Sequence, residues 1–238
     1  MEYRVNGGGR EIAYTLTRRK MKNIRIRVTG AGSVQVSAPH TEAAGRISAF
    51  VQENAKFILQ KLDETEALRK KYYPVSYRTG DTFWYLGEVA PLTVVVSKKT
   101  KAVLEERGLK LYVPSDADYR YRKALFILWF ERQADKVFTE RAKEIFPMFR
   151  HLAKQNVHVS VKNMLTRWGS VNPRRHTISF SVHLLRCEPA LIDYVIMHEL
   201  CHFAHSNHSR AFYAELDAHC PNRKQMDKRL KEYGLVDF

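Results

Sequence analysis

The chain has 238 residues, of which 45% are hydrophobic and 27% are charged, a composition ordinary for one or two globular domains. Its 40 Lys and Arg residues outnumber 25 Asp and Glu, and the net charge of +15 either favours polyanionic partners, such as nucleotides or nucleic acid, or serves solubility. The sequence has no apolar run long enough to span a membrane, no signal-peptide core at its start and three cysteines at no zinc-cluster spacing, so we expect a reduced, cytoplasmic protein.

The first part of the chain is predicted to be rich in strands. Residues 11–20 and 22–29 alternate loosely between apolar and polar side chains, and glycines near residue 31 predict a turn into a further strand at 33–37, as in a hairpin or meander. A helix is then predicted from Thr41, its expected N-cap, to Leu62, with fraying over the charged residues that follow.

More strands are predicted before the middle of the chain. Residues 83–86 and 92–96 read as two strands, and shorter ones flank the turn at Arg107 and Gly108. We therefore divide the chain into a β-rich N-terminal region with one helix, residues 1–115, and a second domain, residues 116–238.

The second half opens with a long predicted helix from Tyr119 to about Met148. Residues 157–161 and 177–182 then alternate cleanly, and the turn-forming residues at 172–175 predict that they form an antiparallel pair. A helix is predicted to start at Pro189, and a closing helical segment completes the chain.

The helix that begins at Pro189 contains His198-Glu199-Leu200-Cys201-His202. Residues four apart project from the same face of a helix, so His198 and His202 can hold one metal ion between them. Glu199 lies on the flank, near enough to reach a water on that ion. Cys201 is expected to be a small buried residue rather than a ligand.

A catalytic metal needs a third protein ligand and an open position. His205 lies on the same face, but roughly 7 Å too far along the helix axis at 1.5 Å per residue. Asn207 can adopt the left-handed conformation that ends helices, and the chain could then return His208 to the metal. Glu215 and His219 on the next helical segment are the alternatives.

These residues resemble the YgjP-like metallopeptidases, a branch related to the SprT and WLM groups. The resemblance extends over residues 18–20, 24–28, 36–39, 167–170, 193–195, 198–202, 207–209 and 212–213. It implies zinc bound by His198, His202 and His208, with Glu199 as general base. Val171 stands where the family often has Cys, which argues against a thiol at that place.

The order of the predicted elements agrees with this resemblance. A helix, a strand pair and then the His-Glu-x-x-His helix is the order of a minimal zincin core. We therefore expect an α+β fold, in which a β-rich N-terminal half precedes a minimal zincin core made of a long helix, an antiparallel strand pair, the metal helix and closing helices.

The expected reaction is hydrolysis by a metal-activated water, with Glu199 as the general base. The resemblance suggests Arg167 as the group that stabilises the developing oxyanion, although a surface ion pair explains an arginine there equally well. Trp168 and Tyr194 are expected to be packed rather than to contact substrate.

Two substrate classes remain open for such a hydrolase. The first is polypeptide, which makes the protein a zinc metallopeptidase. The second is a phosphoanhydride such as a nucleoside triphosphate, which would suit the charge of +15. A third hypothesis, a nucleic-acid-associated module with a structural metal, is disfavoured because Glu199 stands beside an open coordination position.

Overall fold

The computed structural model describes residues 2–153 and 156–238. Two compact units are present, one made of Met1–Arg69 with Val236–Phe238 and the other of Lys70–Leu235. Residues 70–115 therefore belong to the second unit, and the boundary expected at residues 115–116 lies inside it. That residues 116–238 form a catalytic domain of their own stays a prediction.

The first unit is built on a four-stranded sheet in the order β1-β2-β4-β3. Its strands are β1 (Glu2–Gly7), β2 (Arg10–Arg19), β3 (Arg25–Val28) and β4 (Val34–Pro39). The predicted hairpin is present as β3 and β4, which are antiparallel, whereas β2 and β4 run parallel. The sheet buries Ile12, Tyr14 and Val36 against Ile47, Val51 and Ile58 of the helices that follow.

The single helix predicted after the sheet is two helices, α1 (Ala44–Glu53) and α2 (Ala55–Tyr72). The break is at Asn54, whose side-chain amide donates to the Phe50 carbonyl at 2.8 Å. The N-cap is Ala43 rather than Thr41, and no side chain caps it. Beyond Leu62 the helix continues instead of fraying, because ion pairs one turn apart, such as Lys61–Glu64 at 2.6 Å, support its charged surface.

The second unit begins with another four-stranded sheet, in the order β5-β6-β8-β7. Its strands are β5 (Thr82–Tyr85), β6 (Glu88–Val96), β7 (Lys101–Glu105) and β8 (Gly108–Val113), as predicted apart from an earlier start of β6. The turn between β5 and β6 needs positive φ at both Leu86 (51°) and Gly87 (88°), which gives a tight two-residue hairpin. Its backbone amides donate to the Leu185 and Arg186 carbonyls, so the hairpin is attached to the segment before the metal helix.

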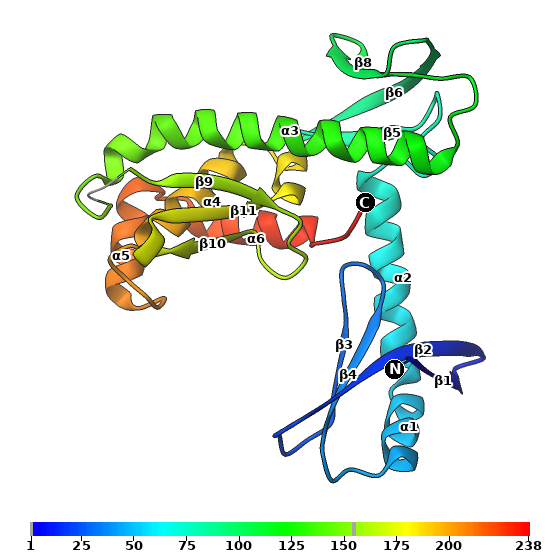
Figure 1. The fold of residues 1–238 in the computed structure, drawn as a ribbon. Helices are drawn as coiled ribbons and strands as arrows, with labels where there is room; N and C mark the ends of the chain where they lie inside the picture. Colours follow the sequence, from blue (N-terminus) through cyan, green and yellow to red (C-terminus); the bar gives the residue numbers. More distant parts are fainter. Residues whose placement is uncertain (1, 154–155) are drawn as a thin grey trace. The chain divides into compact units, whose positions relative to one another are not determined.

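The long predicted helix is α3 (Tyr119–Ile145), capped by the Asp118 side chain, which accepts from the Tyr121 amide. It ends in a 3-10 turn, η1 (Phe146–Phe149), because Pro147 cannot continue the α-helical hydrogen bonds. Its buried face is mainly aromatic, and Phe126 and Trp129 pack on Phe83 of β5. The helix also lies along β9 of the next sheet (Figure 1).

That sheet has three strands, β9 (His158–Lys162), β10 (Gly169–Asn172) and β11 (Thr177–Ser181), in the order β10-β11-β9. The predicted antiparallel pairing of the two alternating segments is wrong, because β9 and β11 are parallel. The antiparallel neighbour of β11 is β10, which lies in the stretch expected to connect them. The turn at 172–175 therefore joins β10 to β11 and places β10 at the edge of the sheet.

The remaining elements are η2 (Pro173–Arg175), η3 (Val182–Arg186), α4 (Pro189–Cys201), α5 (Arg210–His219) and α6 (Arg223–Tyr233). Helix α4 packs against α3, β10, α5 and α6, and Arg141 of α3 forms a two-pronged ion pair with Asp193 of α4. The predicted α+β class is confirmed, since a β-rich N-terminal half precedes a long helix, a strand-containing segment, the helix with His198 and the closing helices. Every helix in residues 2–153 and 156–238 is too short or too polar to cross a membrane.

Candidate metal centre and active site

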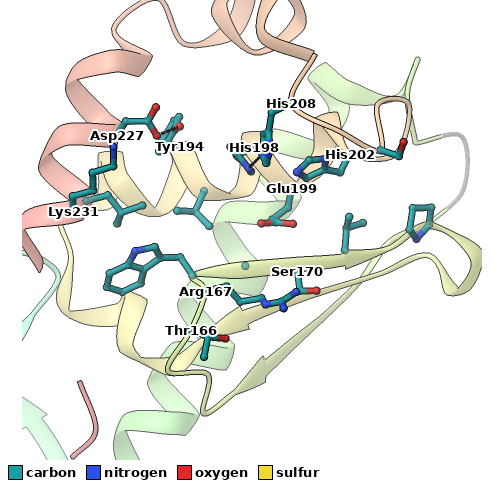
Figure 2. Close-up of a pocket in the computed structure, with 17 residues that line it drawn as sticks. Thr166, Arg167, Ser170, Tyr194, His198, Glu199, His202, His208, Asp227 and Lys231 are labelled. Carbon is teal, nitrogen blue, oxygen red and sulfur yellow. Dashed lines mark hydrogen bonds between the residues drawn. The ribbon is translucent and has the colours of Figure 1, made fainter. Parts of the chain in front are cut away.

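Three histidine side chains converge beside helix α4. His198 and His202 lie one turn apart on the helix, and His208 reaches them from the loop that leads to α5 (Figure 2). One ring nitrogen of each lies within 4.8 Å of the others, and the Nε2 atoms of His198 and His208 are 3.0 Å apart. The local helix geometry accounts for the first two, and the loop accounts for the third.

The loop returns because α4 ends where the motif ends. His202 is the C-cap residue, and its Nδ1 donates to the backbone carbonyl of His205 at 2.8 Å. This bond turns the chain, and it leaves the Nε2 lone pair of His202 available as a ligand. His205 therefore contributes its backbone carbonyl, which accepts from the His202 ring. Among the described residues, the ring that joins His198 and His202 in the cluster is that of His208.

The three side chains fit a transition-metal ion. Burial, together with the nearby imidazoles, lowers the pKa of His198 to about 4, and burial also lowers the pKa of His202. Both rings are therefore neutral at physiological pH, which is the form that binds a metal. Donor atoms around a tetrahedral ion with bonds of about 2.0–2.1 Å stand roughly 3.3 Å apart, close to the spacing of His198 and His208.

Glu199 points from α4 towards strand β10 (Figure 2). It is only 6% exposed, and this burial raises the pKa of its carboxyl to about 7, against the opposing effect of the Arg167 charge. A carboxyl with a pKa near neutrality can both accept and donate a proton at physiological pH, as general acid–base catalysis requires.

The histidines and Glu199 line one cavity of about 720 Å³ between α4, β10 and α6. Arg167, just before β10, and Lys231 of α6 bring positive charge to it, and Asp227 of α6 brings negative charge. The Arg167 side chain is exposed, so it is free to face a ligand in the cavity. The structure therefore brings every predicted site residue to the same place.

The two aromatic residues near the site differ. Tyr194 is packed, as expected, with 3% of its surface exposed and its hydroxyl donating to Asp227 at 2.5 Å. Trp168 is half-buried and lines the cavity, with the Arg186 guanidinium 5.5 Å from its ring centre.

Two residues that support the site were not identified as site residues from the sequence. The Phe212 ring lies 5.0 Å from that of His198, 4.7 Å from that of His202 and 4.8 Å from that of His208 between centroids, so it forms the apolar floor under all three. Gly169 faces Glu199 so closely that a Cβ there would lie 2.5 Å from Oε1. The aromatic residue one turn after His208 was the available signal for the first. The second lies in the segment 167–170 that carries the family resemblance, but nothing in the sequence indicated that it faces Glu199.

The alternative third ligands lie elsewhere. Glu215 and His219 of α5 are grouped with His151, which follows η1, and not with His198 and His202. The candidate for the third ligand of the first cluster is therefore His208.

Comparison with known proteins gives a family and two similar structures. A search among curated proteins finds no match. The metallopeptidase zymogen abylysin of Pyrococcus abyssi matches 40% of this chain and 99% of its own, at 20% identity and a TM-score of 0.35. The zymogen of jannalysin from Methanocaldococcus jannaschii matches 40% of this chain and 94% of its own, at 19% identity and a TM-score of 0.36.

The family comparison covers far more of the chain. Residues 22–233 match the YgjP-like metallopeptidase domain, and this range includes the three histidines, Glu199 and Arg167. A metallopeptidase domain implies a hydrolase with a metal cofactor, in agreement with the imidazole cluster. The chain belongs to the YgjP-like metallopeptidase-domain family.

Proposed function

We propose that the protein is a zinc-dependent hydrolase that cleaves peptide bonds, with His198, His202 and His208 as zinc ligands and Glu199 as general base. The observation that carries this proposal is the convergence of three imidazole nitrogens within 4.8 Å at a cavity that also holds a buried carboxyl. The family assignment supports the same chemistry.

The donor set favours zinc. Three imidazoles with a fourth position open to the cavity are a ligand arrangement of catalytic zinc sites, whereas structural zinc is enclosed by four protein ligands. When bound, such an ion supplies Lewis-acid polarisation and lowers the pKa of a water molecule towards neutrality.

Glu199 would move the proton in this reaction. Its carboxylate accepts a proton from the attacking water and then returns it to the leaving group, and a pKa of about 7 suits both steps. Gly169 leaves the space in which that carboxylate sits. Arg167, at the same cavity, would stabilise the negative charge that develops on the substrate oxygen.

A phosphoanhydride hydrolase is the second candidate. The observation that favours it is the presence of Arg167 and Lys231 in the cavity, since two cations suit a triphosphate better than an uncharged peptide bond. The net charge of +15 would steer such a substrate towards the protein. A nucleic-acid-associated protein with a structural metal is less well supported, because that function has no use for the carboxyl of Glu199.

One experiment separates these functions. Zinc-loaded and chelator-treated protein are incubated in parallel with unfolded casein and with a panel of nucleoside triphosphates, and the products are analysed for new peptide termini and for phosphate or pyrophosphate. The Glu199→Gln variant is the control for contaminating enzymes. New termini that require both zinc and Glu199 support the peptidase, and zinc-dependent pyrophosphate release supports the second candidate. If neither product forms, both functions are rejected.

A further inference from the structure

A second group of metal-ligand side chains lies outside the site described above. It consists of His151, which follows η1, and Glu215 and His219, which are one turn apart on α5. The Nε2 atom of His151 is 2.9 Å from Oε1 of Glu215, and the Nε2 atom of His219 is 3.4 Å from the same oxygen. All three ligand atoms lie within 4.8 Å of one another.

The fold brings these residues together from distant parts of the sequence. Pro147 ends α3 and starts the 3-10 turn that places His151 beside α5. The buried ring of Phe149 then packs on His219, with 4.3 Å between the ring centres. Glu215 and His219 need only the helix, since residues at i and i+4 share a face. The helix and the packing of Phe149 thus hold Glu215 and His219, so a bound ion would have to order mainly the exposed His151 side chain.

The group is distinct from the first cluster. Phe212, which contacts the first three histidines, precedes His219 by seven residues, which is about 10 Å along the axis of α5. The N-terminal end of α5 follows His208 directly through its N-cap, Ser209. Helix α5 therefore meets one histidine cluster at its start and the other near its end.

We propose that His151, Glu215 and His219 form a second metal site, which binds a divalent cation of the zinc class. Two imidazoles and one carboxylate are a donor set for zinc and related ions, and imidazole in particular suits them over magnesium or calcium. The separations of 2.9 and 3.4 Å bracket the roughly 3.3 Å expected between ligands of a tetrahedral ion.

The site would act on structure rather than on the reaction. A cation held there joins the end of α5 to the segment that follows α3. Since α5 also carries Phe212 and begins at His208, this cross-link would hold the helix that supports the first cluster. Glu215 is only 22% exposed and His219 24%, while His151 is exposed at 53%, so the ion would enter from the His151 side.

Metal stoichiometry tests the proposal independently of any activity. Full-length protein is saturated with zinc, desalted and measured by mass spectrometry of the metal. The proposal expects about two zinc ions per chain in the wild type and about one in His219→Ala. The matched control is His158→Ala, an exposed histidine of β9 that belongs to neither group, which should keep both ions.

A second set of variants separates the two sites. His208→Ala should lose one ion and retain the other, and His208→Ala combined with His219→Ala should lose both. Zinc should raise the melting temperature of His208→Ala but not that of the double variant. If His219→Ala folds poorly, His151→Ala makes the same test, because its side chain is exposed.

The outcomes that overturn the proposal are equally clear. One ion in the wild type, lost in His208→Ala and retained in His219→Ala, would mean that the second group is only an ion-pair network of histidines around Glu215. Two ions in both the wild type and the His219→Ala and His151→Ala variants would place the second ion elsewhere. In both cases the proposed function of the first site would stand.

Discussion

Replacement of Gly169 by Ala tests how Glu199, the proposed general base, is held. The added Cβ would lie 2.5 Å from Oε1, 2.6 Å from Cγ and 2.7 Å from Cδ of Glu199, whereas ordinary contact begins at 3.4 Å. The carboxyl must then move by about 0.9 Å, and a displacement of about 1 Å can cost roughly 100-fold in rate for a positioned catalytic group. We therefore expect kcat to fall by about two orders of magnitude.

The fold should survive this change. Gly169 lies in a regular strand, where Ala is conformationally acceptable, and replacing Gly by Ala gains about 0.4–1 kcal/mol by restricting the unfolded chain. Overpacking costs about 1–3 kcal/mol, so we expect a net loss of no more than about 2.6 kcal/mol. Zinc content should stay at the wild-type value, because no zinc ligand moves.

The assay measures kcat on the substrate identified by product analysis, together with zinc content and urea unfolding. Gly45→Ala is the matched control, since a Cβ at that helical glycine meets nothing within 4 Å and activity should be unchanged. A wild-type kcat in Gly169→Ala would refute the reasoning that Gly169 positions the base. A loss of zinc would show that a change in strand β10 also displaces the histidine ligands, contrary to the expectation that only Glu199 moves.

Four further outcomes are expected. Glu199→Gln should retain zinc and the fold, and its rate should fall by a factor on the order of 10²–10⁴ in steady-state assays; unchanged activity would mean that another group is the base. His208→Ala should lower zinc occupancy at the first site more than His205→Ala, and equal loss would contradict the third-ligand assignment. Burial and the charge of Arg186 lower the pKa of His183 to about 3 in the folded protein, below the unfolded value of about 6.5. The contribution of the neutral His183 ring to the free energy of unfolding is therefore complete above pH 6.5 and is lost as the pH falls towards 3. Urea unfolding across this range should therefore give a steeper acid loss for the wild type than for His183→Gln, by at most about 1.4 kcal/mol per pH unit, and parallel slopes would disprove it. If the substrate is a polyanion, kcat/KM should drop steeply with salt while kcat stays nearly constant, because the Debye length falls from about 10 Å at 0.1 M to about 3 Å at 1 M; a flat response on every substrate would assign the positive charge to solubility.

The sequence by itself determined the parts of the site that depend on local geometry. The spacing of His198 and His202 fixes their common face as soon as the segment is a helix, and Glu199 then has a defined position on its flank. The choice of His208 over His205 followed from the rise per residue and an expected reversal of the chain. The chain does return, with the His202 ring bonded to the His205 carbonyl, but the left-handed conformation expected at Asn207 is wrong. The α+β class and most strands followed from periodicity and turn residues in the same way.

Strand pairing was decided only by the tertiary structure. The alternation of β9 and β11 is the same whether they pair parallel or antiparallel, so the pattern could not reveal that β10 intervenes. This difference matters to the site, because it is β10 that carries Gly169 to Glu199. The cavity between α4, β10 and α6, and the raised pKa of Glu199, both depend on that placement.

Long-range association explains the remaining differences. Glu215 and His219 are compatible with the first cluster by spacing alone, and only the packing of Phe149 on His219 and the position of His151 show that they form a separate group. His151 is 64 residues from Glu215. Local periodicity in the sequence shows which face of a helix or strand a residue occupies. Which other element packs against that face depends on contacts among many residues that are distant in the sequence, so a local pattern cannot show it.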